Sequence, residues 1–179
     1  MRKTMKISWI ALILSAICWA GCRQKAEDPQ KRYADAKALF EHAIKEFHLP
    51  SGATAGAEQA RLQAEAVKEY ERLLKKYPEQ GHWCAEALCS LGNVRAAQTN
   101  LNAALECWSE VVVKYPREEW EVITALKSSA DLLWEHNRQA EAKPLYQKII
   151  AQFDQTNAPA VVQVIVRGSK LKLAGRATE

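Results

Sequence analysis

A single interval recurs along this chain, and it constrains the fold more than any other feature. Tyr77-Pro78, Tyr115-Pro116 and Phe153-Asp154 are evenly spaced, with a period of 38. Proline ends a helix, a small residue lets two helices approach closely, and an aromatic ring fills the space beside it. An alanine followed four residues later by an aromatic residue recurs with the same period, as Ala66 and Tyr70, Ala104 and Trp108, and Ala142 and Tyr146. The sequence therefore predicts an all-α chain of packed helix pairs.

The stretch from residue 85 to residue 116 resembles a tetratricopeptide repeat. Leu91-Gly92 takes the Leu-Gly position of that pattern, Ala104 and Trp108 take its Ala-x3-aromatic pair, and Pro116 closes the unit. The resemblance implies a tetratricopeptide-like solenoid of about three helix pairs plus a C-terminal single helix. The period of 38 is longer than that of the usual unit, which has about 34 residues.

Turn and cap residues place the expected helices. A first helix begins after Asp28, its expected N-cap, and ends at His48-Leu49-Pro50; a second covers residues 57–76. Two further pairs span residues 81–115 and 119–153, with turns at 98–100 and 136–138. Asn100 is the expected N-cap after the first of these turns.

The C-terminal segment, residues 157–174, is expected to form a single helix that closes the array as a half repeat. Residues 161–166 read Val-Val-Gln-Val-Ile-Val and also have strong strand propensity. A helix is preferred because a lone strand would have no partner.

The N-terminus has the pattern of an export signal. Three cationic residues precede an apolar run from residue 7 to residue 20, and the run ends at Trp19-Ala20-Gly21-Cys22. This end resembles a bacterial lipobox, which implies cleavage after residue 21 and acylation of Cys22. The alternatives are plain secretory cleavage after Ala20 or an uncleaved anchor. The expected organisation is a lipoprotein signal peptide at 1–21, a polar tether and helix start at 22–31, and a helical repeat domain at 32–179.

Charge gives no reason to expect nucleic-acid binding. Without the three cationic residues of the signal segment, 22 of the 25 Lys and Arg remain against 21 Asp and Glu. The long repeat in an exported chain is similar to the repeats of outer-membrane assembly lipoproteins and of the periplasmic protein that coordinates the Tol-Pal system. That similarity implies a protein or peptide partner in the cell envelope and a membrane contact through the N-terminal lipid. Arg23 follows Cys22 where inner-membrane retention would favour Asp, so the outer membrane is preferred.

Few residues suggest a disulfide, a metal site or catalysis. Cys84, Cys89 and Cys107 are expected either as one disulfide with a free thiol or as three buried thiols, and the second is preferred. His82 lies close to Cys84, but the spacing matches no zinc pattern, so no metal is expected. No nucleophile, phosphate-binding or dinucleotide motif is present, and neither enzymatic activity nor a cofactor is expected.

Tetratricopeptide repeats line a concave groove with the first helix of each unit. By register, the residues expected to bind a partner are Asn93, Lys127, Asp131, Trp134 and Ile165, accompanied by Glu86, Cys89, Ala97, Thr124, Glu135, Val162 and Ser169. Asn93 and Lys127 would hold a peptide backbone or carboxylate, and Trp134 would be an aromatic anchor. The alternative is that Lys127 and Asp131 form an ordinary i,i+4 surface pair and that Trp134 belongs partly to the core.

These features together predict a non-enzymatic, lipid-anchored scaffold that binds protein partners during envelope assembly or maintenance. Two alternatives remain open. In the first, the chain is a structural lipoprotein that self-associates through Val162, Val164 and Ile165, forming a homo-oligomer. In the second, it is a non-catalytic subunit of an envelope enzyme complex.

Overall fold

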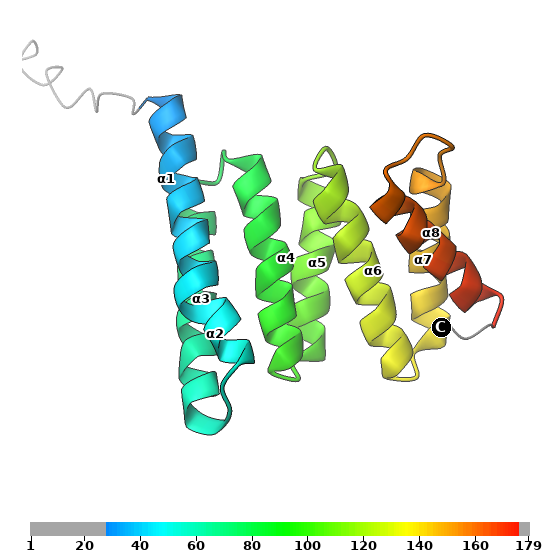
Figure 1. Cartoon of the computed structure of the whole chain (residues 1–179), viewed down its shortest axis with the longest axis horizontal. Coiled ribbons are helices and arrows are strands. Elements are labelled where there is room, and N and C mark those ends of the chain that lie inside the picture. Colours follow the sequence, from blue (N-terminus) through cyan, green and yellow to red (C-terminus); the bar gives the residue numbers. More distant parts are fainter. Residues whose placement is uncertain (1–27, 176–179) are drawn as a thin grey trace, which may run out of the picture.

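The computed structural model describes residues 28–175, and every regular element within them is helical (Figure 1). The all-α expectation is therefore confirmed. Residues 161–166 lie in the last helix, so their strand propensity does not decide their structure. The elements are α1 (Pro29–His42), the π-helical turn η2 (Ala43–His48), α2 (Leu49–Gly52), α3 (Gly56–Lys76), α4 (Gly81–Ala97), α5 (Leu101–Lys114), α6 (Glu119–Glu135), α7 (Gln139–Phe153) and α8 (Ala160–Leu173).

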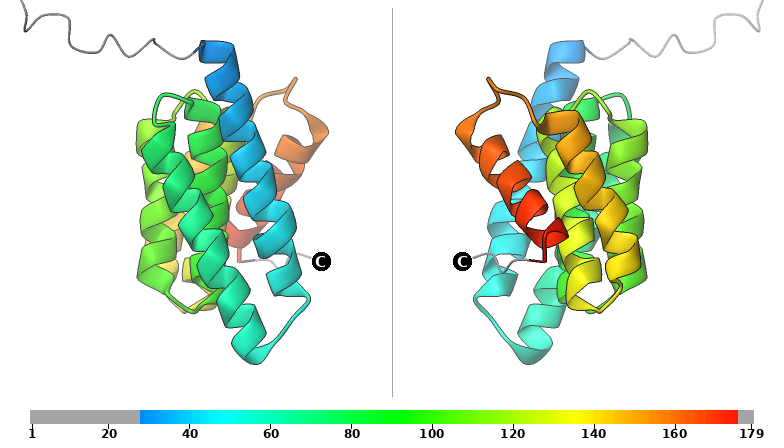
Figure 2. Two further views of the ribbon diagram at one scale, coloured as in Figure 1. Left: turned by 90° about the vertical axis from the view of Figure 1, so that its left-hand side faces the viewer. Right: turned by 90° about the vertical axis from the view of Figure 1, so that its right-hand side faces the viewer.

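The helices stand side by side in a row that follows the chain from α1 to α8 (Figure 1). Neighbours in sequence make the main contacts, above all α4 with α5 and α6 with α7. In the view of Figure 1, α4, α6 and α8 lie in front of α5 and α7. The side views show that α1 and α8, at opposite ends of the row, project toward the same side (Figure 2).

Caps and turns fix where the helices begin. The Asp28 carboxylate accepts a hydrogen bond from the Gln30 N–H at 3.0 Å, and the Asn100 side chain accepts one from the Ala103 N–H at 3.3 Å. Both residues therefore act as the expected N-caps, since each satisfies a backbone donor of a first helical turn. The two tight turns use a residue with positive φ, Thr99 at 59° and Asn137 at 60°.

Pro50 does not end the first helix, contrary to the expectation from sequence. The helix continues through η2 and α2 to Gly52. In the widened π turn, the Leu49 N–H bonds to the Ile44 carbonyl, five residues back. Proline lacks an N–H and its ring clashes with the carbonyl four residues before it, so a π turn just ahead of Pro50 relieves both problems.

The recurring alanine and aromatic positions form the core. Ala66, Ala104 and Ala142 are fully buried, and Tyr70, Trp108 and Tyr146 are at most 3 % exposed. The core has two parts that meet at α4, one under α1 and α3 and the other extending through α5, α6, α7 and α8.

Candidate functional site

A groove of about 330 Å³ lies between α6 and α8. Three of the predicted partner-binding residues, Lys127, Asp131 and Ile165, line it together, as do two others that share their register, Glu135 and Ser169. The remaining lining residues are Tyr146, Val164, Gly168 and Lys172. Two lysines, two carboxylates and an apolar edge therefore face one hollow.

Tyr146 and Asp131 form the floor of this groove. The buried Tyr146 hydroxyl donates a hydrogen bond to Asp131 Oδ1, and Lys127 Nζ donates one to Asp131 Oδ2, both at 2.5 Å. Burial first, and then the Asp131 carboxylate, raise the pKa of the Tyr146 hydroxyl. Lys127 and Asp131 form the i,i+4 pair, but an ammonium group has three donors, so Lys127 can still bind a ligand oxygen.

Trp134 supports the groove and does not line it. The centroid of its half-buried ring lies 5.9 Å from the centroid of the Tyr146 ring. The Lys172 ammonium lies 5.4 Å from the centroid of the Trp134 ring. These contacts fix Tyr146 and Lys172, which do line the groove. Trp134 therefore matches the core alternative better than the exposed-anchor expectation.

Besides Trp134, six residues expected in the groove are not part of its lining: Glu86, Cys89, Asn93, Ala97, Thr124 and Val162. Asn93 is exposed on α4 and is not part of the groove lining. Cys89 is buried, and its thiol donates to the Glu121 backbone carbonyl at 3.5 Å. Register on a helix predicts a face, but the depth of a side chain also depends on how the next helix packs.

The three described cysteines are free thiols. Cys84 and Cys89 are buried, as in the preferred interpretation of the sequence, whereas Cys107 is only half-buried. Burial is the main cause that raises the pKa of each thiol, to about 12 for Cys89 and about 11 for Cys107. Thiols with such raised pKa values are poor nucleophiles near neutral pH.

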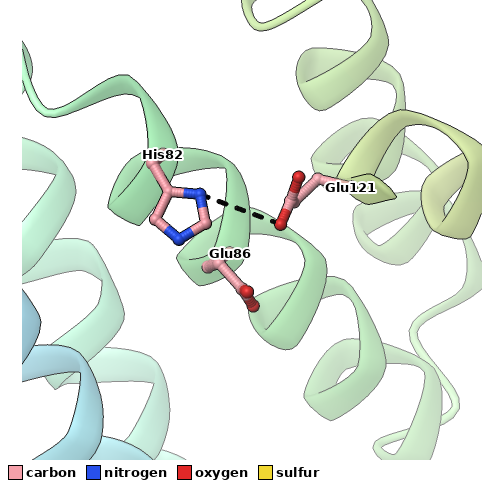
Figure 3. Close-up of side chains that lie close together, drawn as sticks. All are labelled: His82, Glu86 and Glu121. Carbon is pink, nitrogen blue, oxygen red and sulfur yellow. Dashed lines mark ion pairs between the residues drawn. The ribbon is translucent and has the colours of Figure 1, made fainter. Parts of the chain in front are cut away.

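A candidate metal-binding cluster, which the sequence did not predict, lies at the start of α4 and α6. His82, Glu86 and Glu121 come together there (Figure 3). No local ligand motif indicates it, because Glu121 lies in the following helix pair.

Some expectations lie outside the described residues, including the signal peptide at 1–21 and the acylated Cys22. Across residues 28–175, none of the helices combines the length and apolar character needed to span a bilayer. Comparison with protein-family models, curated proteins and solved structures finds no match to this chain.

Proposed function

We propose that this chain is a non-enzymatic scaffold that binds an envelope protein through a tetratricopeptide-like array of helices. The repeat interval supports the array, because the starts of α4 and α6 are 38 apart and so are the starts of α5 and α7. The turn residues with positive φ, Thr99 and Asn137, share this interval. In such an array α8 is the closing half repeat, and the first helices of the pairs form the binding face.

The α6–α8 groove is the observation that carries this function. Its lysines and carboxylates can pair with charges of both signs, and Val164 and Ile165 offer an apolar edge. An extended peptide presents this combination of charged groups, backbone polar groups and an apolar side chain. The groove therefore suits a peptide segment of a protein partner better than a small apolar ligand.

The cellular setting rests on the N-terminal pattern. A lipobox-like end at Cys22 would place the chain on the exported side of a bacterial membrane, held by its lipid. Envelope assembly or maintenance, at the outer membrane rather than the inner one, is the role that we propose for it.

A capture experiment with matched variants tests this function. The full-length chain is used to retain partners from detergent-solubilised envelope membranes, and mass spectrometry identifies what is retained. Lys127→Ala combined with Ile165→Ala should lose the partner. Lys143→Ala, which removes another exposed lysine, on α7, should keep it. Equal retention by all three proteins would reject the groove as the binding surface.

Self-association is the second candidate, and exposed apolar residues near α8 favour it. Trp120 is 46 % exposed and Val161 is 51 % exposed, and both line a hollow of about 470 Å³ between the starts of α6 and α8. Sedimentation over a wide concentration range separates the two candidates. A chain that remains monomeric supports the scaffold, and a reversible dimer supports self-association.

A further inference from the structure

His82, Glu86 and Glu121 form a compact cluster at the junction of two helix pairs (Figure 3). One ligand atom from each residue can be chosen so that all three lie within 4.8 Å of one another. His82 and Glu86 are four residues apart on α4 and therefore share a helix face. Glu121 reaches the same point from the first turn of α6. None of these residues lines the α6–α8 groove.

The Glu121 carboxylate is buried without a matching side-chain donor. The residue is 5 % exposed. His82 Nδ1 lies 3.9 Å from Glu121 Oε1, which is an ion-pair distance and too long for a hydrogen bond. Within residues 28–175, no side chain donates a hydrogen bond to this carboxylate. A backbone hydrogen bond and the His82 ion pair are its partners. Burying a negative charge is costly, and a divalent cation beside it would offset that cost.

Neighbouring carboxylates strengthen this preference. Glu86 lies in the same cluster as Glu121, and Glu118 lies directly before α6, the helix that carries Glu121. Glu118 Oε2 lies 3.3 Å from His82 Nδ1. Three carboxylates thus surround one imidazole, and a single protonated histidine cannot balance them.

The donor types indicate which cation fits. An imidazole nitrogen with carboxylate oxygens is typical of zinc and other first-row divalent metals, whereas magnesium and calcium prefer oxygen alone.

We propose that His82, Glu86 and Glu121 bind a divalent first-row transition-metal ion, with Zn²⁺ the best match. Such an ion would join α4 to α6 and so fix two adjacent helix pairs relative to each other. Its binding would stabilise the fold to a degree that rises with the free metal concentration. With three protein ligands, one coordination position would remain for water or for a group on a partner.

Zn²⁺ titration of the full-length chain tests the proposal. The protein is purified in detergent, stripped of metal with a chelator and titrated in a calorimeter. We expect one Zn²⁺ bound by the unmodified chain. His82→Gln and Glu121→Gln should each weaken binding by more than the roughly 10–100-fold typical of losing an outer partner of a metal ligand. His136→Gln is the matched control. His136 is exposed at the end of α6, away from the cluster, so this variant should bind Zn²⁺ as the unmodified chain does.

Two further measurements make the test decisive. Circular dichroism checks that each variant keeps its helical fold. Co²⁺ is used as a spectroscopic probe, because thiolate ligands give intense charge-transfer absorption that nitrogen and oxygen ligands do not. No Zn²⁺ binding, equal affinity in His82→Gln, Glu121→Gln and the control, or a thiolate spectrum would overturn the proposal. The last result would assign the metal to cysteine, and any of the three would leave the cluster as an ion-pair network.

Discussion

The Trp108 indole occupies the space that a side chain at position 92 would need. A Cβ atom added to Gly92 would lie 2.3 Å from Trp108 Nε1, far inside van der Waals contact. The same Nε1 donates a hydrogen bond to the Cys89 backbone carbonyl at 3.2 Å. The contact between α4 and α5 therefore depends on a glycine on one helix and a tryptophan on the other. One period further along the chain, the equivalent positions hold Ala130 and Tyr146, both buried in the core.

Gly92→Ala should destabilise the fold, although alanine favours a helix over glycine. Overpacking typically costs about 1–3 kcal/mol, and the ring cannot withdraw without breaking its hydrogen bond. Gly168→Ala is the control, because nothing lies within 4 Å of its added Cβ and it should stabilise α8 by up to about 1 kcal/mol. Urea unfolding measures both, and equal effects would contradict the steric account.

The cost of Gly92→Ala should fall when the tryptophan is absent. In a Trp108→Leu background the ring atoms that meet the new methyl group are gone, so the two substitutions should couple by at least about 0.5 kcal/mol. A double-mutant cycle from urea unfolding measures this coupling. Simple additivity would show that Gly92 is constrained by something other than Trp108.

Tyr146→Phe should lower stability and leave the groove less well fixed. It removes the hydrogen bond from the buried hydroxyl to the Asp131 carboxylate. Hydrogen bonds to charged groups contribute about 1.5–3 kcal/mol, and the partial exposure of Asp131 favours the low end. Tyr33→Phe on α1 is the control. Tyr33 is 45 % exposed, so removing its hydroxyl should have little effect on the free energy of unfolding.

Stability should fall as the pH falls below about 6.5, partly because of His48. Burial lowers the pKa of His48 in the folded chain, and its Nδ1 lies 2.8 Å from the Tyr70 hydroxyl. The unfolded chain therefore takes up a proton first, near pH 6.5, and the contribution of His48 is fully present only above that pH. Urea midpoints from pH 7.5 to pH 5 should decline less steeply in His48→Gln. The exposed His42→Gln should retain the slope of the unmodified chain.

Local rules predicted the helices well. Asp28 and Asn100 cap helices as their side-chain chemistry suggests, and the small and aromatic positions lie in the core. Pro50 does not end its helix, because a π turn, which has no simple sequence signature, lets the helix continue through it.

The site was harder to predict, because it depends on how successive helix pairs pack. Helix register correctly predicted that Lys127, Asp131 and Ile165 share one groove, but it could not predict that Cys89 is buried. The candidate metal-binding cluster joins His82 and Glu86 of α4 to Glu121 of α6, and α6 belongs to the next helix pair. A ligand motif within one short stretch of sequence cannot predict such a combination.

Site-specific photo-cross-linking in living cells tests the central claim, that the α6–α8 groove holds a protein partner. A photoreactive residue replaces Val164, which lines the groove and is 64 % exposed, or Val113 on α5, which lies outside it and is 73 % exposed. We predict one discrete adduct with a second protein from position 164 and none from position 113. No adduct from position 164, the same adducts from both positions, or an adduct containing only a second copy of this chain would contradict the claim.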